Sequence, residues 1–273
     1  MKKIILATDF SKGASKAEEM AIAIAKKHIS NIILLYCFTP TYVDPTMPGG
    51  MVIVLDEGKE KQLEDKLSRK ARSIQEQGVR TTFRLSTGSV SDGIKTLVEE
   101  EAADFAILGK TGASGFLDKI LGSTAEYVIN NIKIPLLVVP ENTKSIDVDR
   151  IQYATELEYD ENEILEEVFE IARKLKAEVD FVNVLSDKKL DLVDNAKLID
   201  DMKKSFPNER LNIQSIRSNS VEKAILELSE SKENTALVVA SHHRGFLEGL
   251  LKPSVSKSLI ARTNVPTFVF HFE

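Results

Sequence analysis

The order of strand-like and helix-like segments runs through this chain twice, and the repetition is the strongest constraint on its fold. Short apolar runs alternate with amphipathic segments in both halves, as expected when buried parallel strands are joined by helices. Local matches support an internal duplication. GFLDKILGST at 115–124 resembles GFLEGLLKPS at 245–254, and IPLLVV at 134–139 resembles VPTFVF at 265–270.

Nine segments are predicted in each half. The first half has predicted strands at 3–7, 31–38, 79–85, 105–109 and 134–139, helices after the first strand and at 57–77, 90–101 and 123–131, and a loop at 39–56. The second half has predicted strands at 150–154, 178–185, 210–216, 235–241 and 266–271, and helices at 160–176, 189–205, 220–230 and 254–262.

Parallel strands require crossover helices, so this order predicts an α/β fold with two tandem doubly wound domains. Each domain is expected to have a five-stranded parallel sheet flanked by helices, in the Rossmann-like manner. We predict domains at 1–141 and 149–273, joined by a polar linker at 142–148.

Composition limits the environment and the partners. The single cysteine, Cys37, excludes an intrachain disulfide and a cysteine-rich zinc site, and it favours the cytoplasm. The apolar stretch at the N-terminus is too short for the core of a signal peptide, and we expect no membrane span. The first 141 residues hold 18 basic and 18 acidic side chains, out of totals of 36 and 42, so the whole net charge of −6 lies in the second half. A nucleic-acid partner is therefore disfavoured.

A glycine-rich loop follows the predicted fourth strand. It begins at Gly109-Lys110-Thr111-Gly112 and ends at Gly122-Ser123-Thr124. Glycines let backbone N–H groups approach phosphate oxygens, and a helix N-terminus adds further donors and a partial positive charge. Ser123 and Glu126 have the spacing of a capping box, which predicts the helix start. The loop is not a Walker A motif, because position 104 is Asp where that motif needs Gly.

The Gly-x2-Gly-x9-Gly-Ser/Thr spacing, with Asp9 directly after the first strand in Ala7-Thr8-Asp9-Phe10-Ser11, resembles the universal stress protein family. The resemblance implies ATP, ADP or AMP as the ligand, with Mg²⁺ as a candidate companion. It implicates Asp9, Gly109, Gly112, Gly122, Ser123 and Thr124 in nucleotide binding and places Cys37 near the base. Ala7 and Lys110 complete the candidate binding residues; no catalytic or metal-binding residue is assigned.

The second copy departs from this pattern. Glu156 stands where the first copy has Asp9, Ala240 faces Gly109, and Lys252 and Pro253 face Gly122 and Ser123. Proline donates no N–H, and the lost glycines bring side chains to the place of the phosphates. We therefore expect the second site to be empty or to bind another ligand.

Structural interpretations stand beside these functional ones. The glycines could form only a connection, Asp9 could only cap the following helix, and Lys110 could be a solvated loop lysine. Cys37 is more typical of an inert buried thiol than of a redox sensor, and His242-His243 are more typical of a loop than of a metal site.

We predict that this protein binds a nucleotide for stress signalling rather than catalysing a fast reaction. An unknown protein partner would recognise the nucleotide-bound protein. An enzyme that hydrolyses ATP slowly or adenylylates a substrate, and a nucleotide-free scaffold, are the alternatives. The family resemblance also implies that the strands at 134–139 and 265–270 pair within the chain, which makes it a pseudo-dimer. Association of two chains into a homodimer is left open.

Overall fold

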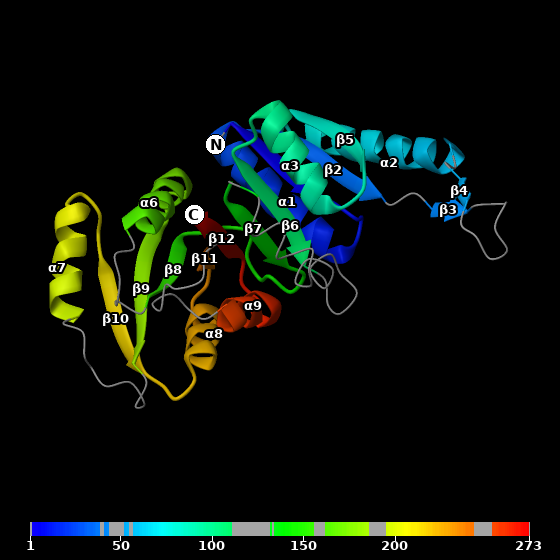
Figure 1. Ribbon diagram of the computed structural model, residues 1–273. Coiled ribbons are helices and arrows are strands. Elements are labelled where there is room, and N and C mark those ends of the chain that lie inside the picture. Colours follow the sequence, from blue (N-terminus) through cyan, green and yellow to red (C-terminus); the bar gives the residue numbers. More distant parts are fainter. Residues whose placement is uncertain are drawn as a thin grey trace.

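The computed structural model describes residues 2–38, 41–43, 52–54, 57–110, 132, 134–155, 162–185, 195–242 and 253–272. Helices and strands alternate along both halves (Figure 1). The first half contains β1 (Lys3–Ala7), α1 (Lys12–His28), β2 (Asn31–Phe38), β3 (Thr41–Val43), β4 (Val52–Val54), α2 (Glu57–Glu76), β5 (Thr81–Thr87), α3 (Val90–Glu101), β6 (Phe105–Lys110) and β7 (Leu136–Pro140). The second half contains β8 (Arg150–Thr155), α6 (Asn162–Leu175), β9 (Glu178–Leu185), α7 (Asn195–Ser205), β10 (Asn212–Arg217), α8 (Val221–Ser231), β11 (Thr235–His242), α9 (Pro253–Arg262) and β12 (Thr267–Phe272).

Ten strands form one continuous sheet in the order β10-β9-β8-β11-β12-β7-β6-β1-β2-β5. Within each half the strands are parallel, and their spatial order follows the same 3-2-1-4-5 pattern of chain order. The predicted α/β fold and its duplication are therefore confirmed.

The two halves join through their closing strands. β7 and β12 pair antiparallel, with Leu137 opposite Phe268, which confirms the predicted intrachain pairing. The rings of Phe105 and Phe268 lie 6.0 Å apart across the junction. Because this pairing is antiparallel, the carboxyl ends of the first half's strands and the amino ends of the second half's strands share one edge of the sheet.

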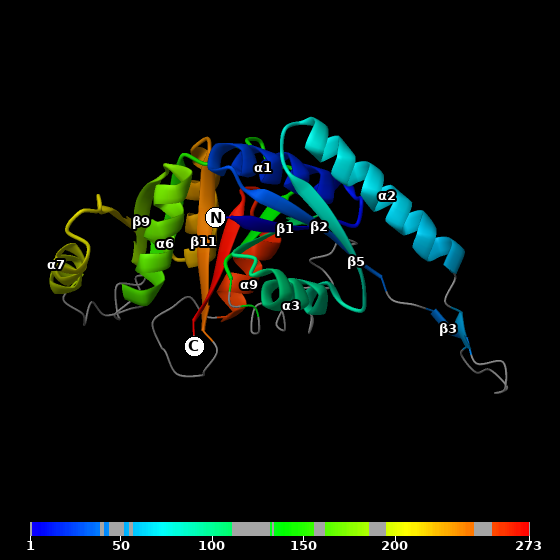
Figure 2. The ribbon, with the colours of Figure 1, turned by 90° about the horizontal axis from the view of Figure 1, so that it is seen from above.

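Helices cover both faces of the sheet (Figure 2). One apolar core lies under α1, α2 and α6 and contains Ile4, Met20 and Phe169. The other lies under α3, α8 and α9 and contains Leu97, Ile225 and Leu259. Since each core contains residues of both halves, the duplicated domains share a hydrophobic core on each face of the sheet.

One predicted loop contains additional strands. β3 and β4 form an antiparallel ribbon within 39–56, with Thr41 opposite Val54 and Val43 opposite Val52. The sequence has the necessary signals, since β-branched and aromatic residues stand on both sides of a Pro- and Gly-containing stretch. The prediction of a plain loop was wrong here. The predicted helix at 123–131 lies outside the described residues, and the domain boundaries at 141 and 149 stay a prediction.

Candidate functional site

The candidate site is at the carboxyl ends of β1 and β6. β1 lies between β2 and β6, and the helices that connect these strands cover opposite faces of the sheet. This is the topological switch point at which doubly wound sheets bind ligands. Ala7 ends β1 opposite Leu108, and Asp9 follows two residues later, so the structure brings Ala7 and Asp9 beside Gly109 and Lys110.

Asp9 shapes the turn between β1 and α1. Its Oδ1 accepts a hydrogen bond from the Ser11 N–H at 2.9 Å, and Ser11 caps α1 by accepting from the Ala14 N–H at 3.2 Å. Between them Phe10 has a left-handed φ of 62°, a conformation that costs energy for a bulky residue and is concentrated at functional sites. The helix cap is therefore Ser11 and not Asp9. Asp9 holds the turn before the helix, and its role toward a ligand stays a prediction.

The first turn of α1 packs directly on Gly109. A Cβ at Gly109 would lie 2.3 Å from the carbonyl carbon of Gly13 and 2.4 Å from the Ala14 nitrogen. No side chain fits there, so close packing of helix on strand alone requires this glycine. The contact also places the N–H-rich end of a 17-residue helix at the switch point, where it favours an anion. Sequence reasoning missed Gly13.

Lys110 bridges the two halves. Its ammonium donates to the carbonyl oxygens of Ile260 at 2.9 Å and Thr263 at 3.4 Å, and to that of Ala261. These carbonyls belong to the end of α9 and the residues after it, where a cation complements the helix dipole. In this structure the ammonium is therefore engaged by the second half, at the beginning of the loop that carries Gly112, Gly122, Ser123 and Thr124. Those four residues lie outside the described part of the chain.

Cys37 lies near the end of β2, against α3. A Cβ at Gly93 would lie 2.6 Å from the Cys37 sulfur, so the small residue on the helix makes room for the thiol. Burial, with the nearby Asp92 carboxylate, raises the pKa of the thiol to about 12. A thiol that stays protonated is a poor nucleophile and redox sensor, which favours the structural interpretation. Its predicted position near a base stays a prediction.

A cluster of aromatic and cationic side chains beside Asp9 was not predicted. The rings of Phe10 and Tyr36 stack with centroids 5.2 Å apart, and the Lys66 ammonium lies 3.8 Å from the centroid of the Phe10 ring. Burial, followed by the Asp9 carboxylate, raises the pKa of Tyr36. The three side chains come from different elements, so the sequence offered only Phe10, next to Asp9, as a signal.

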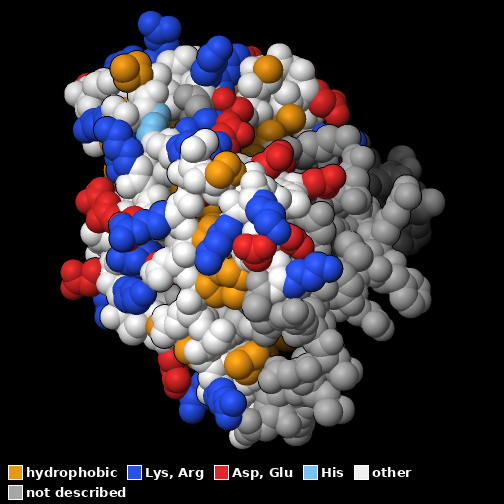
Figure 3. Space-filling model, turned by 90° about the vertical axis from the view of Figure 1, so that its left-hand side faces the viewer, with side chains coloured by type: hydrophobic (Ala, Val, Ile, Leu, Met, Phe, Trp, Pro, Cys, Tyr) orange, Lys and Arg blue, Asp and Glu red, His pale blue; other side chains and the backbone are white. Residues whose placement is uncertain are grey.

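Three further observations concern chemistry and surface. Among the described residues, no group of three or more His, Cys, Asp or Glu side chains could hold a metal ion. No helix in the described part of the chain is long and apolar enough to span a bilayer. On the described part of the face in Figure 3, Lys and Arg side chains are interspersed with Asp and Glu.

The fold defines a tandem α/β protein with a doubly wound, Rossmann-like arrangement of strands and helices in each half. A model of the universal stress protein family matches residues 1–140 and 148–271. The chain belongs to this family and carries its domain twice.

Individual relatives and structures agree with this assignment. The chain is similar to the universal stress protein Sll1388 of Synechocystis sp., with 27% identity over 148 residues, or 50% of this chain and 96% of the relative. It is 30% identical over 144 residues to the universal stress protein MJ0531 of Methanocaldococcus jannaschii, covering 52% and 84%. The crystal structure of a universal stress protein from Archaeoglobus fulgidus shares the fold over 98% of both chains, with a TM-score of 0.69 and 22% identity.

Proposed function

We propose that the first half binds ATP or a related adenine nucleotide at the carboxyl ends of β1 and β6, and that this protein acts by binding rather than by fast catalysis. The observation that carries the proposal is the convergence at one switch point of Asp9, the N-terminus of α1 and the start of the glycine-rich loop. Free N–H groups and absent side chains suit phosphates. A Mg²⁺ ion would arrive with the nucleotide.

The second half would then support the first half structurally and respond to nucleotide binding. Its substitutions at Glu156, Ala240, Lys252 and Pro253 remove the features that favour phosphate. Its α9 engages Lys110 at the beginning of the first half's loop. A nucleotide bound beside Lys110 would thereby change the junction with α9 and alter a surface that a partner protein recognises.

Calorimetric titration tests the proposal. ATP should bind the wild type saturably, and Gly122→Lys, which copies the second half's residue, should weaken binding at least about tenfold because a side chain enters the phosphate site. Gly249→Lys is the matched control, since it makes the same change in the second half, where the first half already has Lys119. This control should bind as the wild type does. No saturable binding by the wild type would refute the proposal.

A further inference from the structure

One large apolar side chain is exposed to solvent at the end of α1. Ile29 is 94% exposed, and among the described residues it is the only large hydrophobic residue of the exposed class. Its backbone has a left-handed φ of 53°. That conformation is an outlier for a β-branched residue, and at helix ends it is usually occupied by Gly or Asn. Neither burial nor helix termination therefore explains an isoleucine at this position.

The second half has the same turn with a different residue. Ile29 lies two residues before β2, and Lys176 lies two residues before β9 with a left-handed φ of 57°. Equivalent backbone hydrogen bonds of 2.9 Å close the two turns, from Ser30 to Ala25 and from Ala177 to Ala172. The same turn thus forms with a lysine, so the fold does not require the isoleucine.

Basic side chains surround Ile29. Lys26 and Lys27 are exposed in the last turn of α1. Backbone hydrogen bonds of 2.9 Å from the first two residues of β2 place the exposed residues Lys2 and Arg80 on either side of the segment that follows Ile29. Lysines in a last turn complement the helix dipole. That reason does not cover Lys2 and Arg80.

The second half adds positive charge to this region. α1 packs against α6, and burial, followed by nearby positive charges that include Lys27, Lys176 and Lys174, lowers the pKa of His28. Lys174 is paired with Glu170. Lys27 and Lys176 form no ion pair with the part of the chain that the structure describes. Their charges are therefore available to a partner.

These side chains form one surface, which we call the Ile29 patch. Its members are one apolar residue and the exposed cations around it: Ile29, Lys2, Lys26, Lys27, Arg80 and Lys176. A second copy of this chain does not fit the patch, because two facing patches would bring like charges together. The partner surface must be negatively charged.

The apolar content of the Ile29 patch favours a lipid surface over a protein. The core of a protein interface buries several apolar side chains in shapes that match, whereas this patch offers one protruding isoleucine. An anionic lipid surface attracts each nearby Lys or Arg, and it takes up an apolar side chain without a complementary pocket.

We propose that the Ile29 patch binds reversibly to the surface of anionic membranes. Ile29 enters the boundary between headgroups and acyl chains, and the surrounding cations contact the lipid phosphates. The net charge of −6 lies in the second half. Because attraction between exposed charges reaches only about 10 Å at 0.1 M salt, the local patch decides the binding. The patch lies at the amino end of β2, whereas the candidate nucleotide site lies at the carboxyl ends of β1 and β6.

Vesicle sedimentation with the full chain tests the proposal. Vesicles of phosphatidylcholine with about 40% phosphatidylglycerol should bind the wild type at about 50 mM salt, at least about tenfold more strongly than vesicles of phosphatidylcholine alone. Raising the salt to about 0.5 M should weaken this binding at least about fivefold, because screening removes the attraction.

Ile29→Asn should weaken binding at least about fivefold, because the amide does not partition into the acyl boundary. Asn tolerates the left-handed backbone better than Ile does, so urea unfolding should show this variant at least as stable as the wild type. A loss of binding is thereby separated from a loss of folding.

The double change Lys26→Gln with Lys27→Gln should also weaken binding at least about fivefold. Lys203→Gln with Lys204→Gln is the matched control, since it removes two lysines from the last turn of α7, and it should bind as the wild type does. Equal losses from the two pairs would overturn the proposal. So would equal binding to both lipid compositions, or unchanged binding by Ile29→Asn. Absence of binding to the anionic vesicles would also overturn it, in favour of an acidic protein surface.

Discussion

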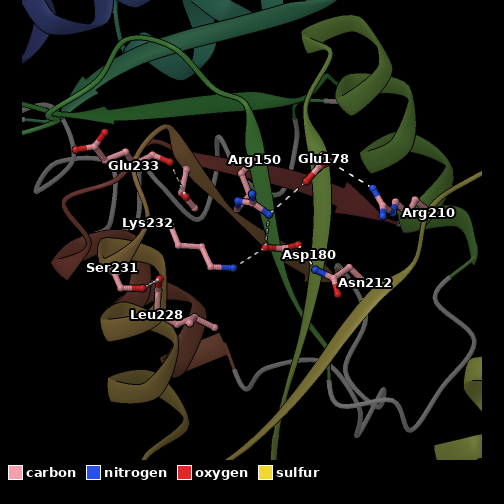
Figure 4. A network of polar contacts seen from close by, with 10 residues as sticks. Arg150, Glu178, Asp180, Arg210, Asn212, Leu228, Ser231, Lys232 and Glu233 are labelled. Atoms are coloured by element: carbon pink, nitrogen blue, oxygen red, sulfur yellow. Dashed lines mark hydrogen bonds and ion pairs between the residues drawn. The ribbon is translucent and has the colours of Figure 1, made fainter.

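The Lys232 ammonium lies 2.9 Å from Oδ2 of Asp180, a carboxylate whose side chain is only 8% exposed. Arg150 donates to the same oxygen at 2.8 Å, and the Asn212 amide donates to the other oxygen at 2.7 Å. The four side chains gather at the amino edge of the second half (Figure 4). One buried carboxylate thus satisfies two cations.

The first half has a different set of charged side chains at the equivalent positions. Strand registers and the equal spacing from the helix N-caps Ser89 and Ser220 make Lys3 equivalent to Arg150, and Glu101 equivalent to Lys232. Lys3 and Glu101 form a direct ion pair at 2.8 Å. In the second half the acid has become a cation, and Asp180 stands where the first half has the core residue Ile33. The first half therefore has a direct ion pair where the second half has a network around a buried carboxylate.

Asp180→Asn should destabilise the protein by about 2 to 3 kcal/mol, because it leaves two cations close together without their carboxylate. The value is below that for a fully buried pair, since Arg150 and Lys232 are 30% and 39% exposed. Urea unfolding measures the effect. Asp201→Asn, on the exposed α7 helix, is the control and should change stability by less than about 0.5 kcal/mol. Equal effects of the two changes would contradict the network's role.

A double variant tests the exchange between the copies. Asp180→Ile with Lys232→Glu reproduces the first half's arrangement, in which an acid pairs directly with the strand's cation. The double variant should be more stable than the sum of the two single changes predicts, by at least about 1 kcal/mol. Additive losses in the double-mutant cycle would show that the two positions are not coupled.

Stability should depend on pH through Asp180. Burial alone would raise the pKa of this carboxyl, but hydrogen bonds from Lys232, Asn212 and Arg150 hold it below the ordinary value of 3.8. A carboxyl with a lowered folded-state pKa contributes stability that is present above its unfolded pKa and is lost as the pH falls through the folded value. The stability difference between wild type and Asp180→Asn should therefore be constant above about pH 5 and should shrink below 3.8. Urea unfolding at a series of pH values checks this, and a difference that grows on acidification would exclude it.

The sequence predicted the order of elements because each strand and helix has a local periodicity. It could not predict the polar contacts that join distant segments. Lys110 and Ile260 are 150 positions apart, and Asp180 is 52 positions from Lys232. For the site, Asp9 and Gly109 were found through family spacing, whereas Gly13 and Tyr36 become apparent only when helix and strand are packed. The spacing of residues in a sequence identifies a motif, but a close contact between distant residues becomes visible only in the three-dimensional structure.

Gly109→Ala should destabilise the fold by about 2 to 3 kcal/mol, because the new methyl group overlaps the backbone of Gly13 at 2.3 Å and forces α1 to shift. The loss should appear in urea unfolding without nucleotide. The reverse change in the second half, Ala240→Gly, is the comparison and should cost only about 1 kcal/mol, the usual penalty of glycine in a strand. If Gly109→Ala leaves stability unchanged and weakens only ATP binding, its glycine serves the ligand and not the packing.

Lys110→Met should loosen the end of α9. Removing the ammonium leaves the carbonyls of Ile260 and Thr263 without this donor, so hydrogen exchange of the α9 amides should accelerate by about fivefold, equivalent to roughly 1 kcal/mol. Lys95→Met, an exposed lysine on α3, is the control and should leave α9 unchanged. If Lys110→Met instead weakens ATP binding tenfold without affecting α9, the lysine serves phosphate rather than the junction.

Cys37 should resist alkylation in the folded protein. The nucleophile is the thiolate, and a pKa raised from 9.0 to about 12 lowers its fraction at pH 8 about 1000-fold. Burial against α3 slows access further.

Because Cys37 is the single cysteine of the chain, iodoacetamide labelling followed by mass spectrometry reports on this residue alone. Labelling should be at least about 1000-fold slower than for glutathione at the same pH and should accelerate fully in urea, where the burial is lost. Labelling of the folded chain at the rate of a free thiol would show an accessible, ionisable sulfur and would restore the redox interpretation.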